Sequence, residues 1–367
     1  MSLTWEIHSS LQEIANLEKQ WRELHRNSIT PSIYNGFDFI FQSVRHFHYP
    51  TVTPFILTIH YQQNLIGLFF LQSDTEKRMG LNVRVIEFCG LEEIDKPTPV
   101  IHQHHQERAW NGFFQYLREN KDWDIVNFIE QQPENIARLK GLSQDHKMIR
   151  RVNEDKSGPI LNLDRDWDEF WQSHRKMRKK LYRIEKEFNH EYEFKVGSGI
   201  ELLNDYISIE ESSWKSGKLG ITKSPNTHDF YLEMANNLKQ DFYIGILYIQ
   251  GEPVSGEIAY HCNGTVYFCH GCYAETFSRY SPGMISTSLF LKYFMQRDAF
   301  HHGDFLCGYA GYLNAWSDET VQTQRIDIYR PNWITGMFFA LRALNKITPP
   351  FIKRFAKVTH ALLKNNS

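Results

Sequence analysis

The sequence predicts an α/β (α+β) protein of two tandem domains, each with a mixed, mostly antiparallel central sheet flanked by helices. Three observations predict this class. The 367 residues are enough to form two cores. The composition, 41% hydrophobic and 23% charged, is typical of globular proteins and not of disordered ones. The two halves also share one order of helices and strands with few matching residues, which indicates one fold present twice; the alternative is that this order is simply common.

The first half, residues 1–155, begins with an amphipathic helix around Trp21. Two strands joined by a polar turn are expected in "FILTIHYQQNLIGLFFLQ", and a third strand in "LNVRVIEFCG". The apolar spacing of "QERAWNGFFQYLREN" predicts a helix. A short strand that contains Asp124 then closes this half.

The second half, residues 156–327, repeats this order. A helix ends near Trp214, two strands meet at the polar turn of "FYIGILYIQGEPVSGEIAYH", and "GTVYFCHG" is a third strand. The helix expected in "GMISTSLFLKYFMQRDAF" leads to a short strand that contains Asp304. We expect the two halves to join within the polar stretch 153–164, which contains glycine and proline.

A basic helix is expected at 167–188, because apolar residues recur there at helical spacing. Its other face carries Arg175, Lys176, Arg178, Lys179, Lys180, Arg183 and Lys186. Such a run of charge is commonly a solvated face. The alternative is an anion site for phosphates of a cofactor or substrate, with Lys176 and Arg178 as the candidate substrate contacts.

The C-terminal segment, residues 328–367, is expected to be a basic amphipathic tail. From Arg330 to Ser367 there is no acidic residue, and lysines and arginines alternate with aromatic and aliphatic residues. Two short helical segments separated by Pro349 and Pro350 would fit the surface of an anionic membrane. The alternative is a helix packed on the body with its lysines in water.

The overall charge and the cysteines exclude several classes of protein. A net charge of −2 gives no general attraction to nucleic acid. Five cysteines in a long chain are typical of reduced thiols and not of a disulfide framework. We find no signal peptide and no apolar run long enough to span a membrane. We therefore expect a cytoplasmic protein, with peripheral contact to the inner membrane through the tail as an open alternative.

The stretch "VYFCHGC" suggests a metal or redox site at first sight. It reads as a strand, and on an undistorted strand Cys269 and Cys272 point to opposite faces. A bulge at Gly271 would re-aim Cys272, yet a structural zinc site needs four ligands and no second pair of this kind exists. We therefore expect no metal.

The loop before the helix that starts near residue 283 is more informative. Proline and glycine end an irregular segment there, so the first amides of the helix lack partners and, with the helix dipole, favour an anion. Glycine lets a phosphate approach the backbone closely. The candidate cofactor contacts are Arg279, Tyr280, Ser281, Pro282, Gly283, Met284 and Ser286.

At this point the second half resembles the GNAT acyltransferase fold, in which three antiparallel strands lead into a loop that holds the pyrophosphate of acyl-CoA. It is similar in particular to the bacterial acetyltransferases associated with cellulose and exopolysaccharide biosynthesis, which are related to Fem-type aminoacyl transferases with paired GNAT domains. The resemblance is carried by "FWQSHRKMRKKLYRIEKEF", "ESSWKSGK", "GEPVSGEIAYHCNGTVYFCHGCYAETFSRYSPGM" and "GDFLCGYAGY", and covers most of residues 160–320.

The resemblance implies an enzyme that transfers an acyl group, most often acetyl, from acyl-CoA to an amine or hydroxyl of a sugar or polysaccharide precursor. An ammonium must lose a proton before it attacks, so a base is needed. Our candidates are His270, Glu257 and Asp304, with Tyr312 as an acid for the leaving thiolate and Trp214 as a wall of the acceptor pocket. The non-catalytic alternatives are that His270 is an ordinary hydrogen-bonded histidine, that Glu257 faces solvent, and that Asp304 only orients the helix or loop beside it.

Two features depart from the family's pattern. Leu313 follows Tyr312 where a lysine is common, and no second glycine closely follows Gly283. The missing lysine puts the acceptor, or the activity, in doubt. Two other functions therefore stay open: tRNA-dependent aminoacyl transfer of the Fem type, and a non-catalytic scaffold with the same fold.

Overall fold

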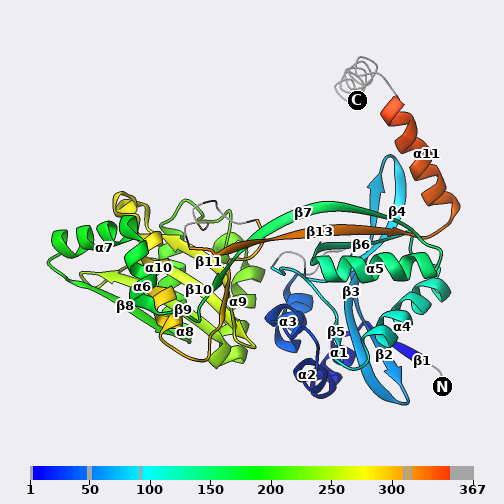
Figure 1. The fold of residues 1–367 in the computed structure, drawn as a ribbon, viewed down its shortest axis with the longest axis horizontal. Helices are drawn as coiled ribbons and strands as arrows, with labels where there is room; N and C mark the ends of the chain where they lie inside the picture. Colours follow the sequence, from blue (N-terminus) through cyan, green and yellow to red (C-terminus); the bar gives the residue numbers. More distant parts are fainter. Residues whose placement is uncertain are drawn as a thin grey trace.

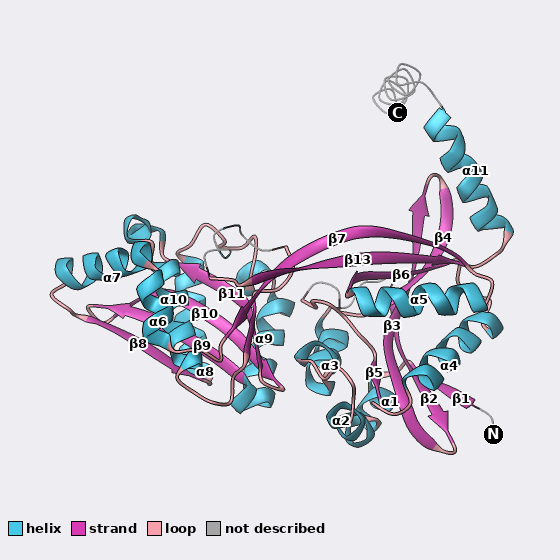
Figure 2. Ribbon diagram, in the orientation of Figure 1, coloured by secondary structure: helices cyan, strands magenta, loops and turns pink. Residues whose placement is uncertain are grey.

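The structure is a computed structural model that describes residues 3–47, 52–90, 93–308, 311, 313 and 316–347. Helices flank one large, mostly antiparallel sheet, so the predicted fold class is confirmed (Figure 2). Two lobes, one from each half of the chain, lie side by side and are joined by two long strands (Figure 1).

The first lobe contains the elements that the apolar patterns predict, together with two additional strands and two additional helices, and the helix expected around Trp21 is divided into two. Its strands are β1 (Leu3–His8), β2 (Thr53–Tyr61), β3 (Asn64–Arg78), β4 (Leu81–Phe88), β5 (Val100–Ile101) and β6 (Ile125–Gln131). Its helices are α1 (Leu11–Asn16), α2 (Glu18–Arg26), α3 (Phe37–His46), α4 (Gln106–Glu119) and α5 (Pro133–Asp145), with a 3₁₀ turn, η1, at Ile33–Asn35. Helices α3 and α5 were not expected.

The second lobe repeats the meander. Its strands are β8 (Tyr192–Gly197), β9 (Phe242–Ile249), β10 (Glu252–Cys262), β11 (Thr265–Tyr273) and β12 (His302–Asp304). Its helices are α6 (Trp167–Ser173), α7 (Arg175–Glu187), α8 (Ile200–Glu211), α9 (Pro225–Leu238) and α10 (Pro282–Met295). The 3₁₀ turns are η2 (Ile221–Lys223), η3 (Lys239–Asp241) and η4 (Glu275–Tyr280). The basic helix expected as one piece is two, because the backbone at His174 (ψ 54°) leaves the helical region between α6 and α7.

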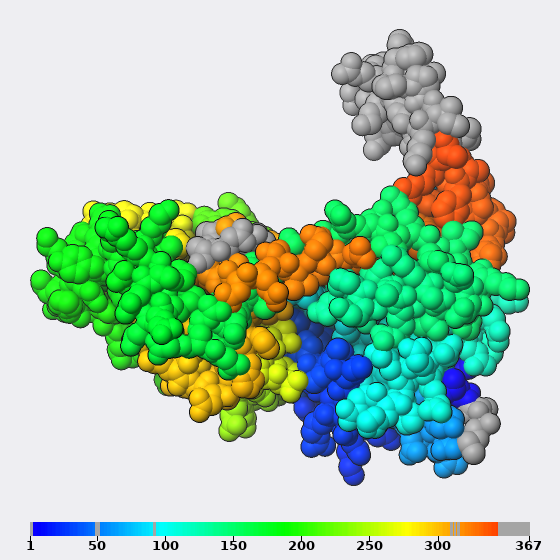
Figure 3. Space-filling view, viewed as in Figure 1, coloured from blue at the N-terminus to red at the C-terminus, as the bar shows by residue number. Residues whose placement is uncertain are grey.

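Two long strands, β7 (Ile149–Asn162) and β13 (Glu319–Tyr329), connect the lobes. The sheet order is β1-β2-β3-β4-β6-β13-β7-β12-β11-β10-β9-β8, so β13, the last strand of the chain, lies beside β6 of the first lobe. Figure 3 shows β13 as an orange band that crosses from one lobe to the other. The stretch that we expected to join the halves lies largely inside β7, and residues 155 and 156 are both part of this strand.

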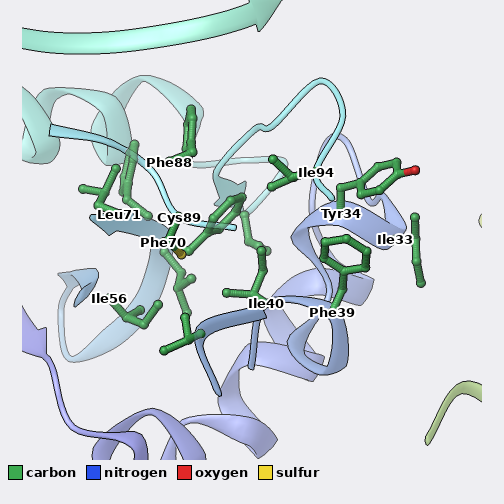
Figure 4. Packing of buried hydrophobic residues seen from close by; sticks show 14 of the residues in the cluster. Ile33, Tyr34, Phe39, Ile40, Ile56, Phe70, Leu71, Phe88, Cys89 and Ile94 are labelled. Carbon is green, nitrogen blue, oxygen red and sulfur yellow. The ribbon is translucent and has the colours of Figure 1, made fainter. Parts of the chain in front are cut away.

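One hydrophobic core runs through both lobes. Figure 4 shows part of it, where Tyr34 and Phe39 of the first lobe lie near the ends of their helices. Their rings meet Tyr267, Phe230 and Tyr260 of the second lobe at centroid distances of 5.4, 5.4 and 6.0 Å. Because aromatic packing of this kind is directional, the lobes are held in one relative position.

The C-terminal segment continues from β13 into α11 (Trp333–Ile347), and the rest of the expected tail lies outside the described residues. Phe338 of this helix is buried and stacks on Tyr329 at a centroid distance of 5.9 Å. Within the described part of the chain, no helix has both the length and the apolar character that crossing a bilayer requires.

Candidate active site at the divergence of β11 and β12

The central feature of the second lobe is a gap between two parallel strands. β11 pairs with β12 only from Thr265 to Tyr267, whereas it stays paired with β10 up to Tyr273. From Phe268 onward the edge of β11 that faces β12 therefore lacks a strand partner. A pocket of about 280 Å³ lies at this divergence. Its lining comes from five places: β10, β11, the segment after β12, α10 and the loop after α8.

The first lobe has the corresponding parallel pair, β4 and β6, but its strand ends early. The ring of Phe88 stacks on Phe128 at 4.5 Å, as Phe268 stacks on Phe305 at 4.9 Å in the second lobe. β4 ends at Phe88, and the amide of Cys89 bonds to the carbonyl of Phe70. The chain then runs to the second lobe, so the free strand edge found on β11 has no counterpart on β4.

A bulge at Cys269 shapes the pocket. Ile258 of β10 pairs with His270 and Ala259 pairs with Phe268, which leaves Cys269 as the extra residue. The bulge that we considered at Gly271 thus lies two residues earlier. On an undistorted strand we expected the two thiols to point to opposite faces. In the structure, Cys269 and Cys272 both pack against the same hydrophobic core cluster. Burial raises the pKa of each thiol.

Glu257 lies on the α10 side of the sheet, under the start of that helix. Its carboxylate is buried and accepts a hydrogen bond from Oγ1 of Thr287 at 2.6 Å. It faces Gly271, where an added Cβ would come within 2.9 Å of Oε2. Burial raises the pKa of Glu257 to about 7, against the hydrogen bond from Thr287 and the charge of Lys215. The solvent-facing alternative for Glu257 is therefore wrong, and the group changes protonation near neutral pH.

Lys215 belongs to this site, although we did not single it out from the sequence. Its Nζ donates to the carbonyl of Gly271 at 2.6 Å and lines the pocket beside Glu257. The lysine follows Trp214, which is 52% exposed and is not among the residues that line the pocket. The segment "ESSWKSGK" was recognised in the sequence, but attention went to its tryptophan. In the structure it is Lys215, and not Trp214, that contacts β11.

His270 lies on the other face of the sheet, against the first lobe. Its Nε2 is 2.5 Å from the hydroxyl of Tyr231 and 3.4 Å from Oε2 of Glu93. The Tyr231 hydroxyl donates to Glu93 at 2.8 Å, and Lys223 donates to the other carboxylate oxygen at 2.7 Å. Because the single proton of Tyr231 goes to Glu93, the His270 contact requires Nε2–H as the donor. Nδ1 is then the ring nitrogen left to accept a proton.

Glu93 is therefore the anionic centre of this cluster. Burial raises its pKa, but the hydrogen bond and charge of His270 and the charge of Lys223 outweigh it, and the pKa falls to about 2. Glu93 comes from the loop after β4, so the first lobe supplies a charged group next to the pocket of the second. The sequence of that loop does not predict this contact, because Glu93 and His270 are 177 residues apart in the chain.

Asp304 lies away from the pocket and pairs with the first lobe. Lys96 Nζ contacts its two carboxylate oxygens at 2.8 and 2.9 Å and also contacts Asp95 at 2.8 Å. Burial raises the pKa of Asp304, and Lys96 opposes the shift. This geometry favours the structural alternative, in which Asp304 orients its loop by accepting from the Leu306 amide. Asp304 lines a second pocket, of about 430 Å³, between the lobes.

One grouping of potential metal ligands lies beside this pair. Atoms of Asp95, Glu130 and Cys307 all lie within 4.8 Å of one another. Cations already neutralise the carboxylates, since Lys156 lies 2.6 Å from Glu130 and Lys96 contacts Asp95. Burial raises the pKa of the Cys307 thiol to about 12.

The start of α10 matches the expected anion site in part. Ser281 adopts the left-handed conformation (φ 55°), and its carbonyl accepts from the amides of Met284 and Ile285. Pro282 has no N–H. The amide of Gly283 lies in the first turn of α10, where amides lack an acceptor within the helix, and it has no acceptor among the described residues. The hydroxyl of Ser286 is buried without a partner in the described chain.

Arg279 and Tyr280 point elsewhere. Both contact the carboxylate of Glu187 on α7, the arginine at 3.0 Å, and the Tyr280 ring is buried. Of the basic helix, Lys176 and Arg178 are exposed, and Arg178 donates to the Gln172 carbonyl.

The cation that reaches the start of α10 is instead Lys180. Its Nζ lies 3.2 Å from Sδ of Met284, and burial lowers its pKa. Tyr312, our candidate acid, lies outside the described residues.

Comparisons with known proteins concern the second lobe and the overall fold. Residues 174–313 match the family model of the acetyltransferase (GNAT) domain. A search of curated protein sequences gave no match. Our narrower resemblance, to the exopolysaccharide-biosynthesis group, is not tested by these comparisons and stays a prediction.

Three solved structures are similar in fold at low sequence identity. FemX superposes with a TM-score of 0.57 and 10% identity, covering 89% of this chain and 97% of that chain. A tandem GNAT protein from the clavulanic acid biosynthesis pathway gives 0.50 and 9%, covering 90% and 100%. The C-terminal domain of a lysylphosphatidylglycerol synthetase from Agrobacterium fabrum, so described in its name as putative, gives 0.53 and 8%, covering 90% and 95%. The chain thus shares its whole architecture, and not one lobe alone, with tandem GNAT proteins.

Proposed function

We propose that this chain transfers an acyl group from acyl-CoA to an amine or hydroxyl of a small-molecule or glycan-precursor acceptor, in the pocket where β11 leaves β12. The observation that carries the proposal is the arrangement at this pocket. A bulged strand with a free edge and two groups suited to proton transfer line one space. Helix α10, which begins with the unpaired amide of Gly283, contributes Thr287 to the same lining.

The donor's phosphates would bind at the start of α10. The Gly283 amide and the helix dipole favour an anion there, and Lys180 adds a positive charge. The pantetheine arm would then extend along the free edge of β11 towards Cys269, where backbone N–H groups without strand partners are suited to the thioester oxygen.

The reaction moves one proton and exchanges two bonds. The acceptor nitrogen or oxygen attacks the thioester carbon, the C–S bond breaks, and CoA leaves as a thiolate that takes up a proton. Glu257, with a pKa of about 7, and Nδ1 of His270 are the two groups beside the pocket suited to remove the acceptor's proton. They lie on opposite faces of the sheet, so a substitution of either residue tests its role without removing the other.

A second candidate is tRNA-dependent aminoacyl transfer of the Fem type, which the likeness to FemX and the exposed bases of α7 favour. The third candidate is a scaffold without catalytic activity. It is favoured by Leu313, which stands where the family that this chain resembles commonly has a lysine. These alternatives differ in what they bind, so ligand binding separates them before any acceptor is known.

The test is a titration of the full chain with acetyl-CoA, longer acyl-CoAs and tRNA, followed by calorimetry or thermal shift. We expect saturable binding of acyl-CoA, with stabilisation of about 2.7 kcal/mol at a hundredfold excess over Kd. Gly283→Glu places a carboxylate at the helix start and should lower affinity at least tenfold, whereas Gly141→Glu, at an open position on α5, should not. Binding of tRNA alone would favour the second candidate, and binding of neither would favour the scaffold.

A further inference from the structure

A second surface of the molecule lies at the free end of the first lobe, around α11. Four large apolar side chains are exposed there: Met79 (39%), Ile149 (48%), Trp333 (73%) and Met337 (37%). They come from three separate segments: the turn between β3 and β4, the start of β7, and α11. We name these three segments together the end face. Exposed apolar groups that gather in one place usually mark an interaction surface.

Strand register brings the start of β7 beside the end of β13, from which the chain enters α11. Tyr329, at the end of β13, pairs with Ile149 on one side and Ile125 on the other, and Ile125 pairs with Val85 of β4. The strands of the β3–β4 hairpin continue past this level to the turn at Met79. Helix α11 then packs beside the hairpin, with Phe338 in one buried cluster with Val83 and Tyr329. Figure 1 shows the hairpin and α11 projecting in the same direction from the sheet.

Helix α11 buries one side and leaves the other open. Thr335 and Phe338 face the body and are buried. Trp333 and Met337, one turn apart, are exposed together with Ala340. The open side thus presents an indole and a thioether to solvent, which is unusual for the outer side of a packed helix.

The end face is also basic. Its bases are Lys77, Arg78, Lys147, Arg150, Arg151, Arg330 and Arg342. Arg78, Arg151 and Arg342 all act on the Tyr329 hydroxyl, lowering its pKa against the effect of burial, which shows that they lie close together. Several acids nearby are paired with bases: Glu76 with Arg78, Asp122 with Arg84, Asp124 with Arg84 and Arg330, and Asp327 with Arg325. Asp145, at the end of α5, adds a further negative charge.

We propose that the end face binds an anionic membrane surface, with Trp333, Met337, Met79 and Ile149 at the level of the headgroups and the surrounding arginines and lysines on lipid phosphates. Lipid accounts for both features, because nucleic acid would satisfy the bases but give the exposed apolar side chains no apolar phase. In the sequence, residues 348–367 contain Lys353, Arg354, Lys357 and Lys364 and no acidic residue.

This inference does not depend on the proposed acyl transfer. The pocket lies at β11 in the other lobe, and Figure 1 shows β11 well separated from α11. A bilayer at the end face would therefore hold the protein at the membrane without covering the pocket.

The test is co-sedimentation of the full chain with vesicles of phosphatidylcholine alone and of phosphatidylcholine and phosphatidylglycerol in equal parts. We expect binding only to the mixed vesicles, weakened by added salt. Trp333→Ala should lower the partition coefficient about tenfold, since an interfacial indole is lost. The matched control is Tyr182→Ala, which removes another exposed aromatic residue, 64% exposed, from the basic helix α7 of the other lobe, and should bind as the wild type does.

Three outcomes would overturn the proposal: no binding to either vesicle, equal binding by Trp333→Ala and wild type, or loss of binding in Tyr182→Ala instead. A fourth is binding of tRNA that Trp333→Ala abolishes while vesicle binding persists, which would make the end face a nucleic-acid surface. Because Trp333 is largely exposed, both variants should melt at the wild-type temperature, and this measurement confirms that each is folded.

Discussion

The carboxylate of Glu93, in the first lobe, lies 3.4 Å from Nε2 of His270 on β11 of the second lobe, and the Tyr231 hydroxyl bridges the two. The first lobe is thus more than a second copy of the fold. Its loop after β4 carries Glu93 to the candidate base of the other lobe, and the same loop carries Lys96 to Asp304.

Glu93 is therefore a positioning residue for His270. Glu93→Gln removes the anion that accepts from Tyr231, so Tyr231 is free to donate to His270 and the Nδ1–H tautomer becomes populated. Histidine ¹⁵N NMR on the full chain should show the Nε2–H tautomer in the wild type and a mixture in the variant. Unchanged ring shifts would contradict this role, and a purely structural role would lower stability without changing the tautomer.

The acid stability of the protein should depend on Glu93. Its pKa is about 2 in the folded state, below the ordinary value of 4.5. The contribution is thus complete above pH 4.5 and is lost as the pH falls towards 2; its size is on the order of 3 kcal/mol. Urea unfolding of wild type and Glu93→Gln across this range should show a falling difference between them. A constant difference would show that the carboxylate is not responsible.

Glu257 should have the opposite pH dependence. Its folded pKa of about 7 lies above the ordinary 4.5, so folding favours the protonated form, and this stabilisation is present below pH 4.5 and lost as the pH rises through 7. Relative to the wild type, Glu257→Gln should be most stable at pH 8. Melting temperatures of both proteins at pH 5 and pH 8 test this, and the same ranking at both pH values would show that Glu257 ionises normally.

The turnover rates of two variants test which group removes the proton of the acceptor. We expect His270→Ala and Glu257→Gln both to fold, and at least one to lower kcat by about 10²-fold, the effect of a positioned base. If Glu257 is the base, the rate with wild type should rise with an apparent pKa near 7. Release of free CoA thiol measures the rate, and full activity in both variants would remove these assignments.

Lys180 and Lys176 differ in their position relative to α10, although they are four residues apart on one helix. Only Lys180 reaches the helix start. Lys180→Ala should raise the Kd for acyl-CoA about fivefold, as expected for loss of one charge at a partly buried anion site, and Lys176→Ala should leave it unchanged. Equal effects in both would indicate a diffuse field along α7 and not a contact at α10.

Much of the fold and only part of the site can be predicted from the sequence. Apolar runs and helical spacing predict β2 to β4, β6, β9 to β12, α4 and α10, because most of these elements carry dense buried apolar residues. The strands β1, β5, β7, β8 and β13 were not predicted. Partners far apart in sequence are not predictable from such patterns. The pairing of β13 with β6, the bulge at Cys269 and the contact of Glu93 with His270 all depend on tertiary packing.

The site residues illustrate this limit. Glu257, His270 and Gly283 were predicted from a local signal, a polar group in a strand or a glycine at a helix start, and the structure places Glu257 and His270 in the lining of one pocket. Lys180 was not singled out because nothing local distinguishes it from the neighbouring bases of α7, and Lys215 was passed over in favour of Trp214 within "ESSWKSGK". Asp304 was assigned to the site from its place in the strand order, and its ion pair with Lys96 could not be foreseen.

The most direct test of the account is a crystal structure of the full chain with acetyl-CoA. We predict the pyrophosphate at the Gly283 amide beside Lys180, and the thioester at the edge of β11 near Cys269. Acetyl-CoA bound elsewhere, for example in the pocket between the lobes beside Asp304, or in the first lobe, would contradict the proposed site.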